Sequence, residues 1–319
     1  MFLPFHPDSR WEIARQIGVT HAIVKLAPDL TGYDAPDKIA VLVEAKRRFA
    51  EAGLILEGLE GDAMDMSRIK LGLPGRDEDI EKYQAMLRNM GEVGIPLLCY
   101  NFMAGIGWYR TRTDVSERGG ALTSEFDLAD VPSEVVRITP EAVWENYRYF
   151  IQRVLPVAEA SGVRMGLHPD DPPIPMLKGY GRFLTSAEGF RRAMALSESP
   201  SHGITFCQAN FFAMGEEVPS LIREWGKRIF FVHFRDIRGA GNHFVEAFHD
   251  NGDHDMADLI RAYREIGFDG PIRTDHAPSL AGEGAGSGYE MMGHIFAIGY
   301  LKGLLAAEDS RERNTSCRK

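Results

Sequence analysis

The sequence predicts an α/β protein whose strands close into a (β/α)8 TIM barrel. Short apolar runs alternate with segments of helical period eight times, which is typical of a parallel sheet covered by helices. The first run begins at residue 2, and a strand at the very N-terminus fits a closed barrel better than an open sheet. The last four runs also end in residues that can bind a metal.

The expected strands are short apolar runs that end where polar residues, Gly or Pro begin. In chain order they are residues 2–5, 21–26, 54–60, 95–101, 164–168, 203–207, 228–235 and 271–275.

Segments of helical period lie between these runs, and most begin at a capping residue or Pro and end before a Gly. The expected helices are residues 9–17, 37–52, 77–93, 140–161, 186–196, 216–225, 253–266 and 289–307.

We expect a single barrel domain over residues 1–308, followed by a polar and frayed tail at 309–319. The longest segment without an expected helix is residues 102–139. Loops of this length in a compact domain are usually lids or binding loops, and the Trp108 and Arg110 side chains favour binding. We therefore expect this loop to lie over the barrel mouth.

Composition excludes several classes of partner. Hydrophobic residues make up 44% and charged residues 26% of the 319, as in a soluble globular protein. The 36 basic and 46 acidic side chains give a net charge of −10, which offers no electrostatic support for binding nucleic acid. No secretory signal pattern begins the chain, and no apolar run approaches the roughly 18 residues of a membrane span. We expect no nucleic-acid partner and no membrane.

The cysteines indicate a reducing compartment. Cys99, Cys207 and Cys317 are too few for a disulfide framework and odd in number, so we expect a cytoplasmic protein. The chain also has no G-x-G-x-x-G after its first strand and no G-x-x-x-x-G-K-[ST] motif. A Rossmann dinucleotide site or a phosphate-binding P-loop is therefore disfavoured.

Ligand-type residues end the last four expected strands: His168, Cys207, His233 and Asp275. Active sites of such barrels form at the C-terminal ends of the strands, so these side chains should converge. Two imidazoles, a thiolate and a carboxylate suit Mn²⁺, Fe²⁺, Co²⁺ or Zn²⁺, and a Cys ligand argues against Mg²⁺ or Ca²⁺. Taken singly, each could be a structural His, a small buried Cys or a capping Asp; their conjunction predicts a metal site.

Two residues beside this set are suited to proton transfer. His276 follows Asp275 and could act as an acid or base near neutral pH. Tyr289, after the Gly-rich segment 282–288, could be its partner, or could pack at the start of a helix.

Four further residues could contact a substrate. Arg235 lies two residues past His233, on the same side of the strand, and suits a carboxylate or hydroxyl; the alternative is an ion pair with Asp236 or Glu246. The others lie at or beyond strand ends and are equally compatible with a role in loop structure. They are Glu60, Asn101 and Arg110.

The sequence resembles the mannonate dehydratase family from about Trp11 to Leu305. The run His168-Pro-Asp-Asp-Pro-Pro173 is its most specific element. Other matching segments are Cys99–Met103 with Trp108 and Arg110-Thr111, Gly162–Met165, Phe206-Cys207, Val232–Arg235, Asn251–Asp253, Arg273 with Asp275-His276, and Gly299–Leu304.

This resemblance implies a barrel related to xylose isomerase that uses Mn²⁺ or Fe²⁺. The implied reaction removes water from D-mannonate to give 2-keto-3-deoxy-D-gluconate in hexuronate breakdown. The family's metal ligands fall on the four residues chosen above, and its acid and base fall on His276 and Tyr289. We expect a cytoplasmic homo-oligomer, a dimer or larger, that binds a small sugar acid.

Departures from the family pattern cluster where a substrate would bind. Lys25 stands in place of a paired His motif, Gln208 follows Cys207 where the family has Thr, and Ala277 replaces Gly after His276. The ligand set is unchanged, so substrate identity is less certain than reaction type. The alternatives are a metal-dependent isomerase or epimerase acting on another sugar, and an inactive sugar-acid-binding protein.

Overall fold

The computed structural model describes residues 1–284 and 288–316. Residues 285–287 of the Gly-rich segment and residues 317–319, including Cys317, lie outside the described part. The chain forms two compact units. The first contains Met1–Trp108 and Pro132–Phe206, and the second contains Tyr109–Val131 and Cys207–Lys319.

The first unit is built on parallel strands in the order β1-β2-β3-β6-β9. Their bounds are β1 (His21–Val24), β2 (Ile55–Glu60), β3 (Leu97–Tyr100), β6 (Arg164–Leu167) and β9 (His202–Cys207). Because all of these strands run the same way, their C-terminal ends meet at one edge. Glu60 ends β2, while Asn101 and His168 directly follow β3 and β6 at that edge.

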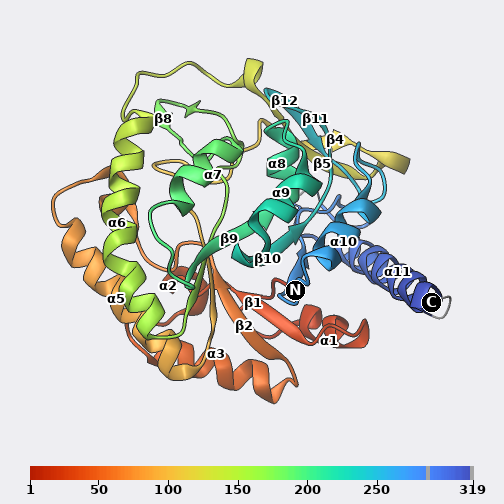
Figure 1. Ribbon diagram of the computed structural model, residues 1–319, viewed down its shortest axis with the longest axis horizontal. Coiled ribbons are helices and arrows are strands. Elements are labelled where there is room, and N and C mark those ends of the chain that lie inside the picture. The colour runs from red at the N-terminus through yellow and green to blue at the C-terminus, as the bar shows by residue number, and fades with distance from the viewer. Residues whose placement is uncertain (285–287, 317–319) are drawn as a thin grey trace. The chain divides into compact units, whose positions relative to one another are not determined.

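Five helices of this unit lie close to their expected positions, and two short ones, α2 and α4, were not predicted. In chain order the helices are α1 (Ser9–Gln16), α2 (Pro28–Thr31), α3 (Ala40–Glu51), α4 (Ser67–Leu71), α5 (Arg76–Val93), α6 (Pro140–Ala160) and α7 (Ala187–Met194). Side chains cap α1, α6 and α7 as the sequence suggests: Asp8, Thr139 and Ser186 accept backbone N–H groups. The helices α5 and α6 lie side by side (Figure 1). A small hairpin, β7 (Met176–Leu177) and β8 (Tyr180–Gly181), precedes α7.

The expected strand at residues 2–5 is wrong as a strand. Phe2 forms only an isolated parallel bridge with Ile23, and the Leu3 N–H donates to the Ile23 carbonyl at 2.9 Å. Pro4 has no N–H and cannot continue the ladder. The other seven expected strands are present.

The second unit contains a parallel pair of strands and a separate antiparallel sheet. The pair is β10 (Ile229–Phe234) and β13 (Ile272–Thr274). The sheet has the order β11-β12-β5-β4, from β4 (Arg112–Ser116), β5 (Leu122–Asp127), β11 (Ile237–Ala240) and β12 (His243–Glu246). Its helices are α8 (Gln208–Ala213), α9 (Val218–Trp225), α10 (Met256–Glu265) and α11 (Met291–Ser316); 3-10 turns lie at Arg118–Gly120, Leu128–Asp130 and Gly226–Arg228.

Two expectations are corrected in this unit. Residues 102–139 are not irregular throughout, because β4 and β5 form a hairpin that turns at Gly119 and Gly120. The helix α11 also continues through most of the expected tail, where Arg264 contacts Asp309. No helix in the described part of the chain combines the length and apolar character needed to span a membrane.

Candidate active site

The strands β10 and β13 bring the predicted residues of the second unit together. His233 lies opposite Arg273, and Phe234 lies opposite Thr274. The Asp275 N–H donates to the Phe234 carbonyl at 3.1 Å, which extends the pairing by one step. Arg235 and Asp275 therefore leave the same end of this parallel pair as neighbours, and Arg235 Nη1 lies 3.4 Å from Asp275 Oδ2.

Two predicted metal ligands meet in this unit. His233 Nδ1 lies 3.5 Å from Asp275 Oδ2, and both residues are buried. Burial opposes ionisation of Asp275, but the basic side chains around it, His276 first and then Arg273, outweigh it and hold the pKa of Asp275 well below its usual value. The carboxylate is therefore charged and available as an oxygen ligand. Cys207, a third predicted ligand, is buried at the end of β9.

The fourth predicted ligand, His168, lies in the first unit directly after β6. Its backbone N–H donates to the Tyr100 carbonyl at 2.8 Å, and its Nδ1 lies 2.8 Å from the Pro169 carbonyl. A carbonyl can only accept, so Nδ1 carries the hydrogen and Nε2 carries the lone pair. Metal-bound histidines are commonly held by such a contact through the other ring nitrogen. The donor chemistry of this residue therefore fits a metal ligand.

A second carboxylate, Glu246 at the end of β12, contacts two guanidinium groups and the His276 imidazole. Its Oε1 accepts from Arg110 Nη2 at 2.5 Å and lies 3.6 Å from Arg235 Nη2 and 3.2 Å from His276 Nδ1. Burial raises the pKa of Glu246, yet the charges of Arg235 and Arg110 lower it further, to about 2. Arg235 also donates to Asn210 Oδ1 at 3.1 Å. Arg235 therefore pairs with Glu246, which is the alternative considered from the sequence. It also lies beside Asp275, at the site where the sequence placed it.

The predicted acid and base contact the same centre. Tyr289 Oη donates to Asp275 Oδ1 at 2.9 Å, and His276 Nε2 lies 3.9 Å from Asp275 Oδ2. The two rings meet edge to face, with centroids 5.2 Å apart. On its other side, His276 Nδ1 lies 2.7 Å from Arg235 Nη1. These contacts bring both side chains to one carboxylate, and their roles in proton transfer stay predictions.

The backbone at His276 needs a glycine beside it. His276 has a φ of +36°, and a Cβ at Gly288 would lie 2.9 Å from the Cβ of His276. Gly288 has a φ of +91°, and its carbonyl accepts from the Ala277 N–H at 2.9 Å. Only a residue without a side chain lets the backbone at position 288 approach His276 this closely.

Two buried histidines contact the segments that carry these residues. His294 contacts Thr274 Oγ1 and the Gly288 carbonyl, both at 2.9 Å, and its ring stacks on Tyr289. His249 Nε2 donates to the Phe234 carbonyl at 2.8 Å. Burial lowers the pKa of His294 to about 3 and that of His249 to about 4. Both rings are therefore neutral supports, one for the Tyr289 segment and one for β10.

Gln208, one of the departures from the family pattern, is fully buried. Its Oε1 accepts from Tyr263 Oη at 3.1 Å, and its Nε2 approaches the Arg235 carbonyl at 3.5 Å. It thus supports the backbone of Arg235. Ala277, another departure, is also buried.

In the first unit, Asn101 is bound into a local network. Its Oδ1 accepts from Lys70 Nζ at 2.9 Å and from the Met103 N–H at 3.1 Å, while Lys70 Nζ also binds Asp62 Oδ2 at 2.6 Å. These contacts favour the loop-structure alternative for Asn101. Glu60 ends β2 and is partly buried.

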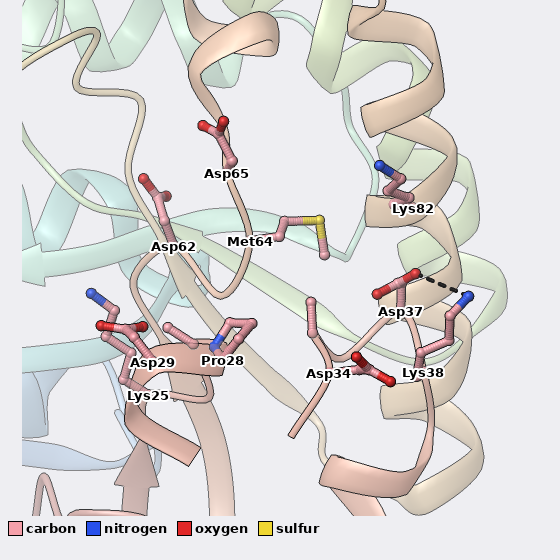
Figure 2. Close-up of a pocket in the computed structure, with 12 residues that line it drawn as sticks. Lys25, Pro28, Asp29, Asp34, Asp37, Lys38, Asp62, Met64, Asp65 and Lys82 are labelled. Carbon is pink, nitrogen blue, oxygen red and sulfur yellow. Dashed lines mark ion pairs between the residues drawn. The ribbon is translucent and has the colours of Figure 1, made fainter. Parts of the chain in front are cut away.

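A cavity of about 610 Å³ also opens in the first unit (Figure 2). Lys25 and Asp29 both line it, and the Asp37–Lys38 ion pair of 3.4 Å lies in another part of the wall. Its lining residues are Lys25, Ala27, Pro28, Asp29, Asp34, Ala35, Asp37, Lys38, Asp62, Met64, Asp65 and Lys82. Lys25, the remaining departure from the family pattern, therefore faces an open and polar space.

Sequence comparison decides the family. The family model described as D-mannonate dehydratase (UxuA) matches residues 12–138 and 133–315. The chain belongs to the mannonate dehydratase family. The prediction from the sequence is confirmed.

Relatives that are named mannonate dehydratase align with most of this chain. The mannonate dehydratase of Enterococcus faecalis is 33% identical over 86% of this chain and 87% of its own length. That of Thermotoga petrophila is 31% identical over 95% of this chain and 98% of its own length.

Solved structures confirm the predicted barrel. Mannonate dehydratase from Streptococcus suis serotype 2 has a TM-score of 0.86 and 29% identity, covering 95% of this chain and 92% of that one. A xylose isomerase domain protein from Planctomyces limnophilus has a TM-score of 0.61 and 16% identity, covering 95% and 93%. This family member therefore has a xylose isomerase-like barrel fold, in which the described parallel sheet has seven strands and not the eight predicted.

Sequence reasoning named Glu246 only as an alternative ion-pair partner of Arg235, and it missed Asn210 altogether. Asn210 lies in α8, and Glu246 lies in a hairpin strand, so neither follows the rule that functional residues end barrel strands. The available signal for Glu246 was the excess of buried positive charge: Arg235 and Arg110 require a counter-charge when buried.

Proposed function

We propose that this chain is a divalent-metal-dependent hydro-lyase that converts D-mannonate to 2-keto-3-deoxy-D-gluconate and water. The observation that carries the proposal is the meeting of His276, Tyr289 and His233 around the Asp275 carboxylate. Full-length relatives named mannonate dehydratase support the choice of substrate.

The proposed metal ligands are His168, Cys207, His233 and Asp275. Support comes from the ionised, buried Asp275, its 3.5 Å approach to His233 Nδ1, and the hydrogen bond that leaves the lone pair of His168 on Nε2. This mixed donor set suits Mn²⁺ or Fe²⁺. A bound divalent ion would stabilise negative charge that develops on substrate oxygens.

The elimination requires two proton transfers, and the tautomerisation that follows it removes the enol hydroxyl proton and adds a proton at carbon. A base removes the proton from the carbon next to the carboxylate, and an acid protonates the hydroxyl that leaves the adjacent carbon as water. His276 and Tyr289 supply these two groups. The enol that remains takes a proton at the carbon that lost the hydroxyl and becomes the 2-keto-3-deoxy acid.

Substrate binding is assigned to Arg235 and Arg110, with Glu60 at a strand end of the first unit. Guanidinium groups bind carboxylates through paired hydrogen bonds, and both arginines are buried in the same cluster. A neutral sugar would lack the group that these cations recognise.

Turnover of D-mannonate by protein loaded anaerobically with Mn²⁺ tests this proposal. We expect metal-dependent release of the 2-keto-3-deoxy acid, and none from the His168→Ala variant. A protein that binds Mn²⁺ stoichiometrically but forms no product would contradict the assignment of substrate.

The cellular form is part of the same proposal. We propose one catalytic barrel over residues 1–308 with the 102–139 segment over its mouth, assembled as a cytoplasmic homo-oligomer. Light scattering of the purified protein measures the oligomer, and a monomer at micromolar concentration would contradict it.

A further inference from the structure

Glu246 is held rigidly beside the groups assigned to chemistry. It lies opposite Ile237 in the β11–β12 pair. Ile237 is only two residues from Arg235 along the chain. The strand β12 also pairs with β5 on its other side. The Glu246 side chain is 1% exposed, so its carboxylate has little freedom to move away.

The contacts at His276 Nδ1 are mutually exclusive. Arg235 Nη1 lies 2.7 Å from this nitrogen and can only donate to it, whereas Glu246 Oε1 lies 3.2 Å from it and can only accept. A neutral imidazole nitrogen is either a donor or an acceptor. The ring therefore carries its hydrogen on Nε2 when Arg235 binds Nδ1, and on Nδ1 when Glu246 does.

We propose that Glu246 is a positioning residue that takes over His276 Nδ1 when Arg235 turns to a substrate carboxylate. This inference rests on the proposed function. When a substrate carboxylate draws Arg235 Nη1 away from His276, Nδ1 is left to the neighbouring Glu246 carboxylate. The Nδ1 hydrogen bond to Glu246 then holds the ring with its Nε2 lone pair directed away from Glu246 and ready to accept a proton.

Glu246 also balances the charge of the substrate-binding arginines. Arg110 binds the same oxygen at 2.5 Å, and neither Arg110 nor Glu246 has an appreciably exposed side chain. Removing the carboxylate charge leaves both guanidinium groups able to bind a substrate anion. The loss should therefore appear in the rate of the bound complex and not in substrate affinity.

Three variants separate this role from simple packing. Glu246→Gln keeps the side-chain volume but loses the charge, and Glu246→Asp keeps the charge but shortens the side chain. Glu117→Gln is the matched control, because Glu117 is another buried carboxylate of this unit, bound to Arg238 and Asn251. Stability and metal content are measured for each.

We expect Glu246→Gln to lower kcat by about 100-fold with KM changed less than about threefold, and Glu246→Asp to recover about tenfold of that loss. Glu117→Gln should keep kcat within about twofold of the unmodified protein. A Glu246→Gln kcat equal to that of Glu117→Gln would overturn the inference. So would a Glu246→Asp variant slower than Glu246→Gln, which is the order that loss of packing volume gives.

Histidine ¹⁵N spectra of the metal-free protein test the contact without turnover, with His276→Asn used for assignment. At a pH where the ring is neutral, Arg235→Met should move the Nδ1 resonance to the range of a protonated nitrogen, and adding Glu246→Gln should reverse the shift. An unchanged Nδ1 resonance in Arg235→Met would overturn the inference. Absence of D-mannonate turnover by the unmodified protein with the expected spectra would overturn the proposed substrate alone.

Discussion

The two units place similar charges in opposite surroundings. In the cavity of the first unit, Lys38 and Lys82 are more than half exposed, although the side chains of their partners Asp37 and Asp79 are mostly covered. In the second unit, Arg235 and Glu246 are each 1% exposed. Charges in water contribute little when paired, whereas buried charges need every partner they have. The second unit therefore keeps its charged groups in fixed positions, as catalysis requires.

The largest expected effect follows from removing the charge at the centre of the buried group. Asp275→Asn should lower kcat by about 10³-fold or more and destabilise the metal-free protein by about 3–5 kcal/mol. The reason is that Arg235 and Arg273 would lose a shared counter-charge, with Arg273 Nη2 now 3.1 Å from Asp275 Oδ1. Steady-state kinetics with metal analysis measures the loss of kcat, and chemical denaturation measures the loss of stability. A free energy of unfolding within about 1 kcal/mol of the unmodified protein would contradict the role of Asp275 as a shared counter-charge.

Acidification should destabilise the second unit through its neutral histidines. The pKa values of His249 and His294 are about 4 and 3, below the ordinary 6.5, so the unfolded chain binds more protons below pH 6.5. The free energy of unfolding that these neutral histidines contribute is complete above about pH 6.5 and is lost as the pH falls toward 4. For His249, whose pKa is the less strongly shifted, the loss is on the order of 3 kcal/mol.

Unfolding free energies of the metal-free protein between these pH values measure the effect. The double variant His249→Gln/His294→Gln should show a flatter dependence, because it has no buried imidazole to protonate. A slope equal to that of the unmodified protein would mean that other groups cause the acid sensitivity.

A smaller change in stability is expected at Tyr289. Tyr289→Phe removes only the hydrogen bond to Asp275, so it should cost about 1 kcal/mol while lowering kcat by about 100-fold. Parallel measurement of the unfolding midpoint and kcat separates the two effects. Full activity in Tyr289→Phe would exclude the tyrosine as a proton donor or acceptor.

The smallest effect is expected in the cavity of the first unit. Asp37→Asn breaks the 3.4 Å contact with the exposed Lys38, and we expect a change in unfolding free energy below about 0.5 kcal/mol. Its kcat should remain that of the unmodified protein. A loss of kcat here would extend the site into this cavity and remove the contrast between the two regions.

The sequence predicted the parallel strands well because their buried runs are continuously apolar, as in residues 229–234. It failed for β4, where four of five residues are polar and the exposed face gives no apolar signal. It also failed at residues 2–5, where the run is apolar but Pro4 interrupts the ladder.

The candidate site was predicted to the extent that its residues end barrel strands. His276, Tyr289, Arg235 and Asp275 meet in the second unit as expected. Glu246 could not be placed in the same way, because its partner Arg110 is 136 residues away along the chain. Their contact depends on the pairing of β12 with β5, which belong to two different hairpins. Long-range partners of this kind are set by tertiary structure and leave no local pattern.

The most direct test of the central claim is the reaction of D-mannonate in D₂O with the Mn²⁺-loaded protein, followed by NMR of the products after metal removal. Elimination with protonation of the enol predicts a 2-keto-3-deoxy acid that carries one deuterium at C3. Deuterium in a sugar acid or ketose that has kept all its hydroxyl oxygens would show isomerisation or epimerisation, and would contradict the assignment of this site to dehydration.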